Sequence, residues 1–515
     1  MPFAAAQLRV VEWNVTNYSG GRVPEFQTAI YGVVPSGLAL AGRSMAPDAI
    51  VGQEFLSQAG VNAFVQLLNT APGSPGDWAA APFIDGPDTD NAFFYRTSKL
   101  VVSNTVIISA ANGSTTLPPR HTVRYDARLA GFADIPGARI SFYSTHMKSG
   151  TASTDLSRRL QEASKIRDNA NGLNTNGSGT ALPAGWNFLV AGDFNIRSAN
   201  ESAYQRMVQS EADDDGRFFD PINAPGTWYS NSAFRFIHTQ DPSTTGSGGM
   251  DDRHDQILIG ASLLNNTPGL AYVGNQALTF SSATWNDPNH SYRCWGNDGS
   301  TFNLSLATAT NTMVGPAIAQ ALVTVTNAGS TSGGHLPVLL DLRVPAKITS
   351  DTILDFGRVR RGSAAIRMLN VSNSTPTGTW VNNGYSPSVA IETLTYTLSA
   401  SFGFVAPAGS FNDVAGGGGN AHTITMNTST IGNKVGVLTI SSNSIETPGR
   451  IVQLVGEVFA CAGDFNDDGL IDFFDYLDFA NAFSAEDVAA DFNGDGTIDF
   501  FDYLDFVQAF DEPCE

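Results

Sequence analysis

Residues 1–345 repeat one pattern of hydrophobic and polar positions. Mostly apolar runs at 8–11, 49–51, 140–143 and 188–191 are each followed within two residues by polar residues. Short runs of this kind are typical of buried strands, and the polar residues that follow them then lie at one edge of a sheet. The pattern therefore predicts a sheet-based domain with polar side chains gathered at that edge.

One amphipathic helix is predicted among these strands. Apolar residues recur at helical spacing over residues 154–170, and Thr154 with Asp155 can cap its first turn. Gly and Asn crowd residues 171–179, which predicts the end of the helix there.

The pattern changes after Pro345. Residues 346–458 carry almost no helical periodicity and alternate like strands between turns rich in Gly, Ser and Asn. About 100 residues of this kind predict an all-β sandwich. The segments LDFGRVRRGS, VGVLTISSNS and QLVGEV resemble the Ig-like sandwich domains that are appended to secreted bacterial enzymes.

Residues 459–515 contain an internal repeat at an offset of 27. In each copy, oxygen-bearing side chains occupy loop positions 1, 3, 5, 9 and 12, with glycine at position 6, which is the spacing of a calcium loop. The ligands predicted for two Ca²⁺ ions are Asp464, Asn466, Asp468, Asp472 and Asp475 in the first loop, and Asp491, Asn493, Asp495, Asp499 and Asp502 in the second.

These loops differ from an EF-hand in two respects. Position 12 is Asp rather than Glu, and no clear helix precedes either loop. The pair therefore resembles a dockerin, a small α-helical calcium module. That resemblance implies a cohesin-like or cell-surface partner. The alternative is that calcium only folds this segment.

Charge and cysteine content indicate an extracellular setting. Residues 451–515 hold seventeen acidic and no basic residues, so they carry −17 of the net charge of −21. The rest is not basic enough to argue nucleic-acid binding from charge alone. Cys461 and Cys514 bracket the acidic segment and are either bridged or unrelated thiols, whereas Cys294 stands alone. No apolar run is long enough to predict a transmembrane helix. We expect a secreted or cell-surface protein whose numbering begins after a removed signal peptide.

The polar residues after the apolar runs have the chemistry of metal-assisted phosphoester hydrolysis. Glu54 offers a carboxylate to a hard divalent cation. His335 precedes another apolar run and is the predicted general base, with Asp255 holding its ring. Asp193 and Asn195 lie two residues apart at one strand end, so they share a face.

Six motifs occur in the order found in the endonuclease/exonuclease/phosphatase superfamily, which includes deoxyribonuclease I. They are VVEWNV, DAIVGQE, FYSTHMKSG, FLVAGDFN, RHDQILIG and GGHLPVLLDL. The resemblance covers about residues 7–345. It implies an α+β fold, a four-layer α/β/β/α sandwich, and the use of Mg²⁺ or Mn²⁺ to split a phosphodiester or phosphomonoester.

The resemblance also implies a role for each matched residue. Asn14 orients Glu54 or binds the metal. Asp193 positions the nucleophile or protonates the leaving oxygen, and Asn195 donates to non-bridging phosphate oxygens. His146 stabilises the pentacovalent phosphate or acts as an acid.

The sequence departs from the superfamily at Gly334. Relatives commonly have Ser-Asp-His-Pro, whereas this chain has Gly333-Gly334-His335-Leu336-Pro337. A carboxylate that helps to bind metal or phosphate is therefore missing, and Asp251 and Asp252 are the nearby residues that could replace it. This departure puts a second metal site in doubt.

Two further groups of residues are candidates for substrate contacts. Lys148, Arg124, Arg197 and Arg253 flank the motifs and are either phosphate contacts or ordinary surface charges. Trp285, Trp295 and Tyr292 lie in an insertion-like stretch that could stack a base, bind a sugar or pack a loop.

These observations predict a secreted, modular, metal-dependent phosphodiesterase, and in particular an endonuclease acting on nucleic acid, tethered through its calcium-binding tail. The first alternative is a phosphatase or a sphingomyelinase-like phospholipase C of the same fold, because substrate choice depends on loops. The second is a non-catalytic extracellular scaffold or adhesion protein, for which Gly334 is the support.

Overall fold

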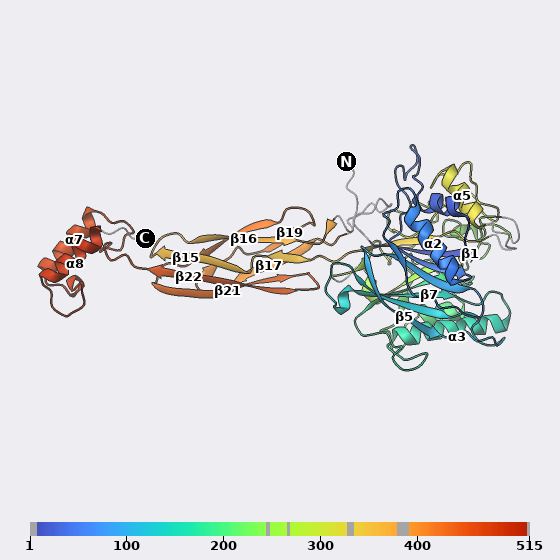
Figure 1. Ribbon diagram of the computed structural model, residues 1–515, viewed down its shortest axis with the longest axis horizontal. Coiled ribbons are helices and arrows are strands. Elements are labelled where there is room, and N and C mark those ends of the chain that lie inside the picture. Colours follow the sequence, from blue (N-terminus) through green and yellow to red (C-terminus); the bar gives the residue numbers. More distant parts are fainter. Residues whose placement is uncertain (1–7, 244–247, 265–267, 327–333, 378–390, 512–515) are drawn as a thin grey trace. The chain divides into compact units, whose positions relative to one another are not determined.

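The computed structural model describes the 515-residue chain except for residues 1–7, 244–247, 265–267, 327–333, 378–390 and 512–515. The chain divides into two compact units. The first comprises residues 1–345 and 376–392, and the second comprises residues 346–375 and 393–515 (Figure 1). The sequence-based boundary between 458 and 459 falls inside the second unit. Among the described residues, no helix is long and apolar enough to cross a membrane.

The first unit contains two β-sheets. The seven-stranded sheet has the order β11-β13-β1-β2-β4-β3, with β12 also paired to β13. Its strands are β1 (Leu8–Tyr18), β2 (Ala49–Phe55), β3 (Trp78–Ala80), β4 (Asp90–Arg96), β11 (Ala271–Tyr272), β12 (Arg293–Cys294) and β13 (Val338–Arg343).

The six-stranded sheet has the order β5-β6-β7-β8-β10-β9. Its strands are β5 (Leu100–Ser109), β6 (Thr122–Leu129), β7 (Arg139–His146), β8 (Asn187–Asp193), β9 (Phe218–Phe219) and β10 (Asp255–Gly260). The two sheets pack face to face: the ring of Phe93 on β4 lies 4.8 Å from that of Phe142 on β7 and 5.1 Å from that of Tyr125 on β6.

Helices cover the outer faces of both sheets. Phe26 of α1 (Val23–Tyr31) and Phe64 of α2 (Gln58–Thr70) pack edge-on against Tyr18 of the first sheet, and α5 (Pro316–Thr326) lies beside α1. On the other sheet, α3 (Ser153–Ala170) and α4 (Ser202–Val208) bury their apolar faces. Central strands with both faces covered are apolar throughout, which explains the continuous runs in the sequence. The mixed α+β class is confirmed.

The predicted helix is present as α3, which begins one residue earlier than the sequence indicates. Asp155 lies in its first turn, and its carboxylate accepts a hydrogen bond from the backbone nitrogen of Ala152. The helix ends at Ala170, where the Gly- and Asn-rich segment starts.

The second unit holds two further sheets around one apolar core. One has the order β14-β16-β20-β18 and the other the order β15-β22-β21-β17-β19. Their strands are β14 (Ile348–Ser350), β15 (Ile353–Arg360), β16 (Ile366–Asn373), β17 (Leu394–Ala400), β18 (Phe404–Val405), β19 (Ser410–Asp413), β20 (Asn420–Met426), β21 (Gly432–Ser442) and β22 (Gly449–Phe459).

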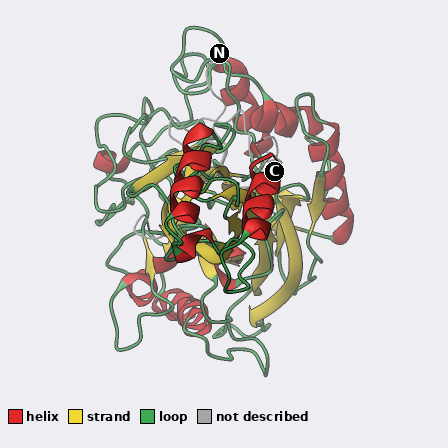
Figure 2. Cartoon of the chain, turned by 90° about the vertical axis from the view of Figure 1, so that its left-hand side faces the viewer, coloured by secondary structure: helices red, strands yellow, loops and turns green. Residues whose placement is uncertain are grey.

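Two helices follow the repeated acidic loops. They are α7 (Phe473–Ser484) and α8 (Phe500–Asp511), which lie side by side (Figure 2). The rings of Phe479 and Phe506 stack between them with centroids 4.0 Å apart. Phe479, Ala490 and Phe506 form the buried centre of this segment, which is a small core.

Candidate active site

Strand pairing brings the predicted site residues together at one end of the two facing sheets. In the six-stranded sheet, His146 pairs with Asp193 across β7 and β8, and Asp193 pairs with Asp255 across β8 and β10. In the other sheet, Asn14 near the end of β1 lies beside the end of β2, which carries Glu54. Each residue therefore reaches the site because its apolar strand ends there.

One carboxylate oxygen is the centre of the site. Asp193 Oδ2 accepts a hydrogen bond from Asn14 Nδ2 at 3.2 Å. It also lies 3.3 Å from His146 Nε2 and 3.8 Å from His335 Nε2. Asp193 Oδ1 accepts a hydrogen bond from the backbone nitrogen of Asn195 at 3.0 Å. Side chains from both sheets thus converge on Asp193.

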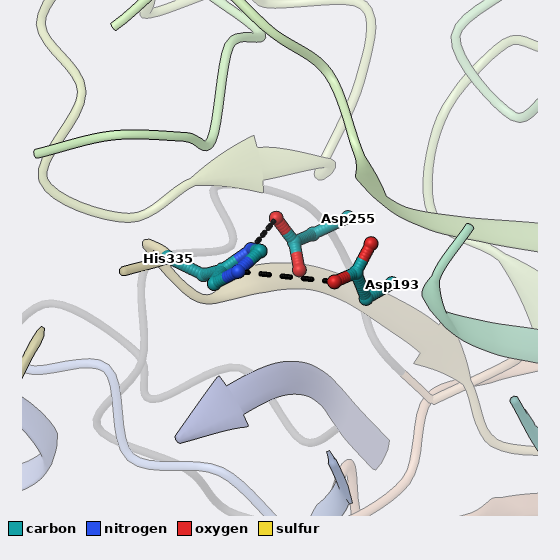
Figure 3. Close-up of side chains that lie close together, drawn as sticks. All are labelled: Asp193, Asp255 and His335. Atoms are coloured by element: carbon teal, nitrogen blue, oxygen red, sulfur yellow. Dashed lines mark hydrogen bonds and ion pairs between the residues drawn. The ribbon is translucent and has the colours of Figure 1, made fainter. Parts of the chain in front are cut away.

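His335 and Asp255 form a buried pair (Figure 3). His335 Nδ1 donates to Asp255 Oδ2 at 2.8 Å, and the carboxylates of Asp193 and Asp255 both point toward the ring. Because a carboxylate only accepts, this bond places the proton on Nδ1 and turns Nε2 toward Asp193. Burial alone lowers an imidazole pKa, but the charges of Asp255 and Asp193 outweigh it and raise the pKa of His335 to about 10.

Asn14 links Glu54, the predicted metal ligand, to Asp193, the predicted catalytic carboxylate. Its Nδ2 donates to Glu54 Oε1 at 3.0 Å as well as to Asp193, and its Oδ1 accepts from the backbone nitrogen of Thr16. The second oxygen of Glu54 accepts from the backbone nitrogen of Asn17 at 2.9 Å. Asn14 therefore orients Glu54 in this structure through its amide nitrogen.

Two site residues adopt strained backbone conformations. Glu54 has a φ of 63° and Asn195 a φ of 52°, in the left-handed region that non-glycine residues rarely adopt. Such strain is concentrated at functional sites. Asn195 Nδ2 donates to the backbone oxygen of Met147 at 3.2 Å, so only its second N–H remains for a phosphate oxygen.

The site contains more carboxylates than the sequence indicated. Glu12 is fully buried on β1, two residues before Asn14 and on the same face of the strand. Burial, followed by the charges of Asp255 and Asp193, raises its pKa well above the usual range. Burial likewise raises the pKa of Asp193 to about 7. In the part of the chain that the structure describes, neither oxygen of Glu12 nor Oδ1 of Asp255 has a hydrogen-bond partner.

A third histidine also faces this region. His254 is 5% exposed, and among the described residues neither of its ring nitrogens has a hydrogen-bond partner. Its Nε2 lies 3.5 Å from Oδ1 of Asp252. Burial lowers the pKa of both His254 and His146 well below the ordinary value, so both rings are neutral at pH 7. His254 lies in the RHDQILIG motif directly before Asp255, but we assigned it no role from the sequence, because a single histidine is usually structural.

The structure shows why a side chain is disfavoured at Gly334, where the superfamily that the sequence resembles commonly has a carboxylate. Its φ is 72°, and a Cβ atom there would lie 2.3 Å from Cβ of Thr326. An aspartate therefore does not fit this position. Asp252 is buried near the site, and burial raises its pKa to about 7.

Several predicted substrate contacts are structural instead. Arg124 is buried in an ion pair with Asp126. Arg253 is also buried, and its guanidinium donates two hydrogen bonds to the carboxylate of Asp220. Neither guanidinium is therefore available to contact a phosphate. The predicted aromatic contacts are also buried, at 7%, 1% and 0% exposure for Trp285, Trp295 and Tyr292 respectively. They pack a loop. Lys148 and Arg197 remain partly exposed.

The acidic loops of the second unit have a different organisation. The carboxylate of Asp475 accepts hydrogen bonds from the backbone nitrogens of Asn466 and Asp472. Asp502 accepts equivalent bonds from Asn493 and Asp499. The last predicted ligand of each loop therefore closes it onto its own backbone. Cys514 lies outside the described residues, so its pairing with Cys461 stays a prediction.

Comparisons with known proteins give solved structures only. No protein-family model and no curated protein matches the chain. It is similar to an endonuclease/exonuclease/phosphatase family protein from Bacteroides thetaiotaomicron, at 12% identity and a TM-score of 0.33, over 66% of this chain and 98% of that one. It is also similar to an endonuclease/exonuclease/phosphatase from Beutenbergia cavernae, at 11% identity and a TM-score of 0.35, over 87% of this chain and 100% of that one. A third similar structure is sphingomyelinase C from Streptomyces griseocarneus, at 14% identity and a TM-score of 0.35, over 65% of this chain and 99% of that one. Because these TM-scores are low, any conclusion about activity depends on the site's own residues.

Proposed function

We propose that the first unit is a Mg²⁺- or Mn²⁺-dependent phosphodiesterase of the endonuclease/exonuclease/phosphatase type, and specifically a nuclease. The observation that carries this proposal is the convergence on Asp193 Oδ2 of nitrogens from Asn14, His146 and His335, with Glu54 sharing the amide of Asn14. An amide donor and two imidazole rings thus surround one carboxylate oxygen, Oδ2 of Asp193.

His335 is suited to take the proton of an attacking water. Its Nδ1 is fixed by Asp255, which leaves Nε2 as the atom that exchanges a proton. The two carboxylates that raise its pKa stabilise the imidazolium, so the metal-free ring is protonated at pH 7. A cation held by these carboxylates would offset their charge and favour the neutral ring that takes up this proton. A carboxyl group with a pKa of about 7, as at Asp193, can protonate the leaving oxygen.

The donor set fits a hard divalent cation. Glu54, Asp193 and Asp255 supply carboxylate oxygens, and Asp255 Oδ1 has no hydrogen-bond partner among the described residues. Ligand atoms of Asp193, Asp255 and His335 all lie within 4.8 Å of one another. When bound, the cation supplies stabilisation for the negative charge that develops on the phosphate.

The scaffold alternative has weak support, because its only argument was Gly334. A Cβ atom at this residue would lie 2.3 Å from Thr326, which accounts for the missing carboxylate, whereas nitrogens of Asn14, His146 and His335 still surround Asp193. For the second unit, we propose an Ig-like sandwich and a dockerin-like segment that binds two Ca²⁺ ions and a cohesin-like or cell-surface partner, in a secreted protein. The repeated loops that close onto Asp475 and Asp502 support this proposal.

The test is hydrolysis by the full chain with Mg²⁺ or Mn²⁺, using plasmid DNA, RNA, bis-p-nitrophenyl phosphate and sphingomyelin. His335→Ala is the inactive variant. His422→Ala is the matched control, because His422 is a buried histidine of the second unit bonded to Tyr396. Cleavage of nucleic acid that only His335→Ala abolishes is the expected result. Turnover of sphingomyelin alone would favour the phospholipase, and no turnover at all would reject the proposal.

A further inference from the structure

An arginine and a tyrosine form an exposed stack beside the candidate site. The guanidinium carbon of Arg197 lies 4.2 Å from the ring centroid of Tyr229. The side chain of Arg197 is 42% exposed and Tyr229 is 44% exposed, whereas the neighbouring Trp228 is fully buried. A planar cation and a planar ring are thus both presented to solvent at one place.

The backbone fixes both members of the stack. The carbonyl oxygen of Arg197 accepts hydrogen bonds from the backbone nitrogens of Trp228 and Tyr229, at 2.9 and 3.2 Å. Next to them, the nitrogen of Ser230 donates to the oxygen of Asp251. Trp228 anchors this segment, because its indole nitrogen donates to the oxygen of Ala224. The stack is therefore held in place before any ligand arrives.

The stack is also close to the reacting groups. Arg197 follows Asp193 by four residues, which the chain spans in at most about 14 Å. Its Nε lies 3.9 Å from Oδ1 of Asp252, the same oxygen that faces His254. Gln240 forms isolated backbone bridges with both Asp252 and His335, so the segments that carry these two residues both lie against Gln240. A 3.9 Å ion pair leaves the guanidinium with donors for another anion.

We propose that Arg197 and Tyr229 bind the nucleotide next to the scissile phosphate, the guanidinium contacting its phosphate and the stack its base. This inference rests on the phosphodiesterase function proposed above and narrows the substrate to nucleic acid. Bases stack on aromatic rings and on guanidinium planes alike. A quaternary ammonium head group also binds aromatic rings, but here it would meet the charge of Arg197 on the same ring.

The chain offers a matched control for this stack. Arg217 lies over the ring of Phe219 with its guanidinium carbon 4.8 Å from the centroid. Phe219 pairs with Ile259 at the end of β10 opposite Asp255, whereas Arg197 faces Asp252, three residues before Asp255. Phe219→Ala therefore removes a similar arginine–aromatic pair away from the proposed nucleotide position.

The experiment measures steady-state kinetics of the full chain with Mn²⁺ on a single-stranded oligonucleotide, on bis-p-nitrophenyl phosphate and on sphingomyelin vesicles. For Tyr229→Ala we expect the oligonucleotide KM to rise about 5- to 150-fold, with a smaller change in kcat. Tyr229→Phe keeps the ring and should restore most of the binding. Arg197→Ala should raise the oligonucleotide KM. It should also reduce the slope of log KM against log salt concentration by about 1, because one phosphate contact is lost. Phe219→Ala should match the wild type.

The outcomes separate this inference from the proposed function. An active wild type whose oligonucleotide KM is unaltered in Tyr229→Ala would overturn the inference and leave the phosphodiesterase intact. A KM increase for sphingomyelin vesicles but not for oligonucleotide would overturn the assignment to nucleotides. A wild type that hydrolyses no diester would reject the proposed function and this inference with it.

Discussion

The candidate active site and the repeated acidic loops use the same residue type in opposite ways. Burial raises the pKa of Asp193 to about 7. At Asp502, hydrogen bonds from backbone nitrogens, with that of Asp499 first, lower the pKa instead. A carboxylate surrounded by side chains in a buried site favours its protonated form, whereas one that accepts several N–H groups favours its charged form.

The two regions also differ in the sequence distance of their contacts. Asp193 bonds to Asn14, 179 residues away, and His335 bonds to Asp255, 80 residues away. Asp502 bonds to Asn493, nine residues away. The repeated acidic loops are therefore local structures that a spacing pattern defines, whereas the candidate active site exists only when the two sheets have packed. The following predictions test that difference.

The largest effect is expected at His335. His335→Ala should reduce phosphodiester hydrolysis by about 10²- to 10⁴-fold, because the group that takes up the proton is lost. The rate at saturating substrate is the measurement, and circular dichroism checks the fold. Asp475→Asn in the first calcium loop should leave this rate unaltered. A comparable loss in both variants would mean that the two regions are not independent.

Calcium removal should affect only the second region. The segment has a small core around Phe479 and Phe506, and each loop gathers several carboxylates that repel one another without a cation. A calcium chelator should expose residues 461–511 to proteolysis, and excess Ca²⁺ should reverse this. Mass spectrometry of the fragments is the measurement. Resistance in chelator would show that the loops fold without calcium, and cleavage within the first unit would contradict independence.

The pH dependence of stability should identify His335. Its pKa is about 10 in the folded protein, above the ordinary histidine value near 6.5. A group with a raised folded-state pKa contributes stability that is fully present below pH 6.5 and is lost as pH rises toward 10. The loss is at most about 1.4 kcal/mol per pH unit for one proton. Urea unfolding of the metal-free protein should therefore show a stability difference from His335→Gln that shrinks between pH 7 and 10. A constant difference would reject the raised pKa.

The sequence was informative where a polar residue follows an apolar run. Asn14, Glu54, His146 and Asp193 were found in this way, because strand ends meet at one sheet edge. Glu12 was missed because it lies within the β1 strand, where a buried carboxylate was not expected. Only the neighbouring strands show which charges it faces.

Long-range partners also decide between alternatives that the sequence left open. Arg253 precedes His254 and Asp255 in a site motif, yet its side chain is paired with Asp220, 33 residues earlier. Tyr292 lies in a polar stretch, and its burial depends on the packing of the whole loop. Spacing along the chain gives the face on which a side chain lies, but not the partner that occupies it.

The smallest expected effect separates backbone strain from packing at Gly334. Gly334 and Gly37 both have positive φ, 72° and 90°, but an added Cβ meets Thr326 at 2.3 Å only at Gly334 and meets nothing within 4 Å at Gly37. Gly334→Asp should therefore be less stable than Gly37→Asp by about 1–3 kcal/mol, the usual cost of overpacking. Urea unfolding of both variants gives the difference. Equal losses would show that the conformation alone excludes the carboxylate, and a Gly334→Asp protein with full stability and higher activity would show that the position can hold the carboxylate found in relatives.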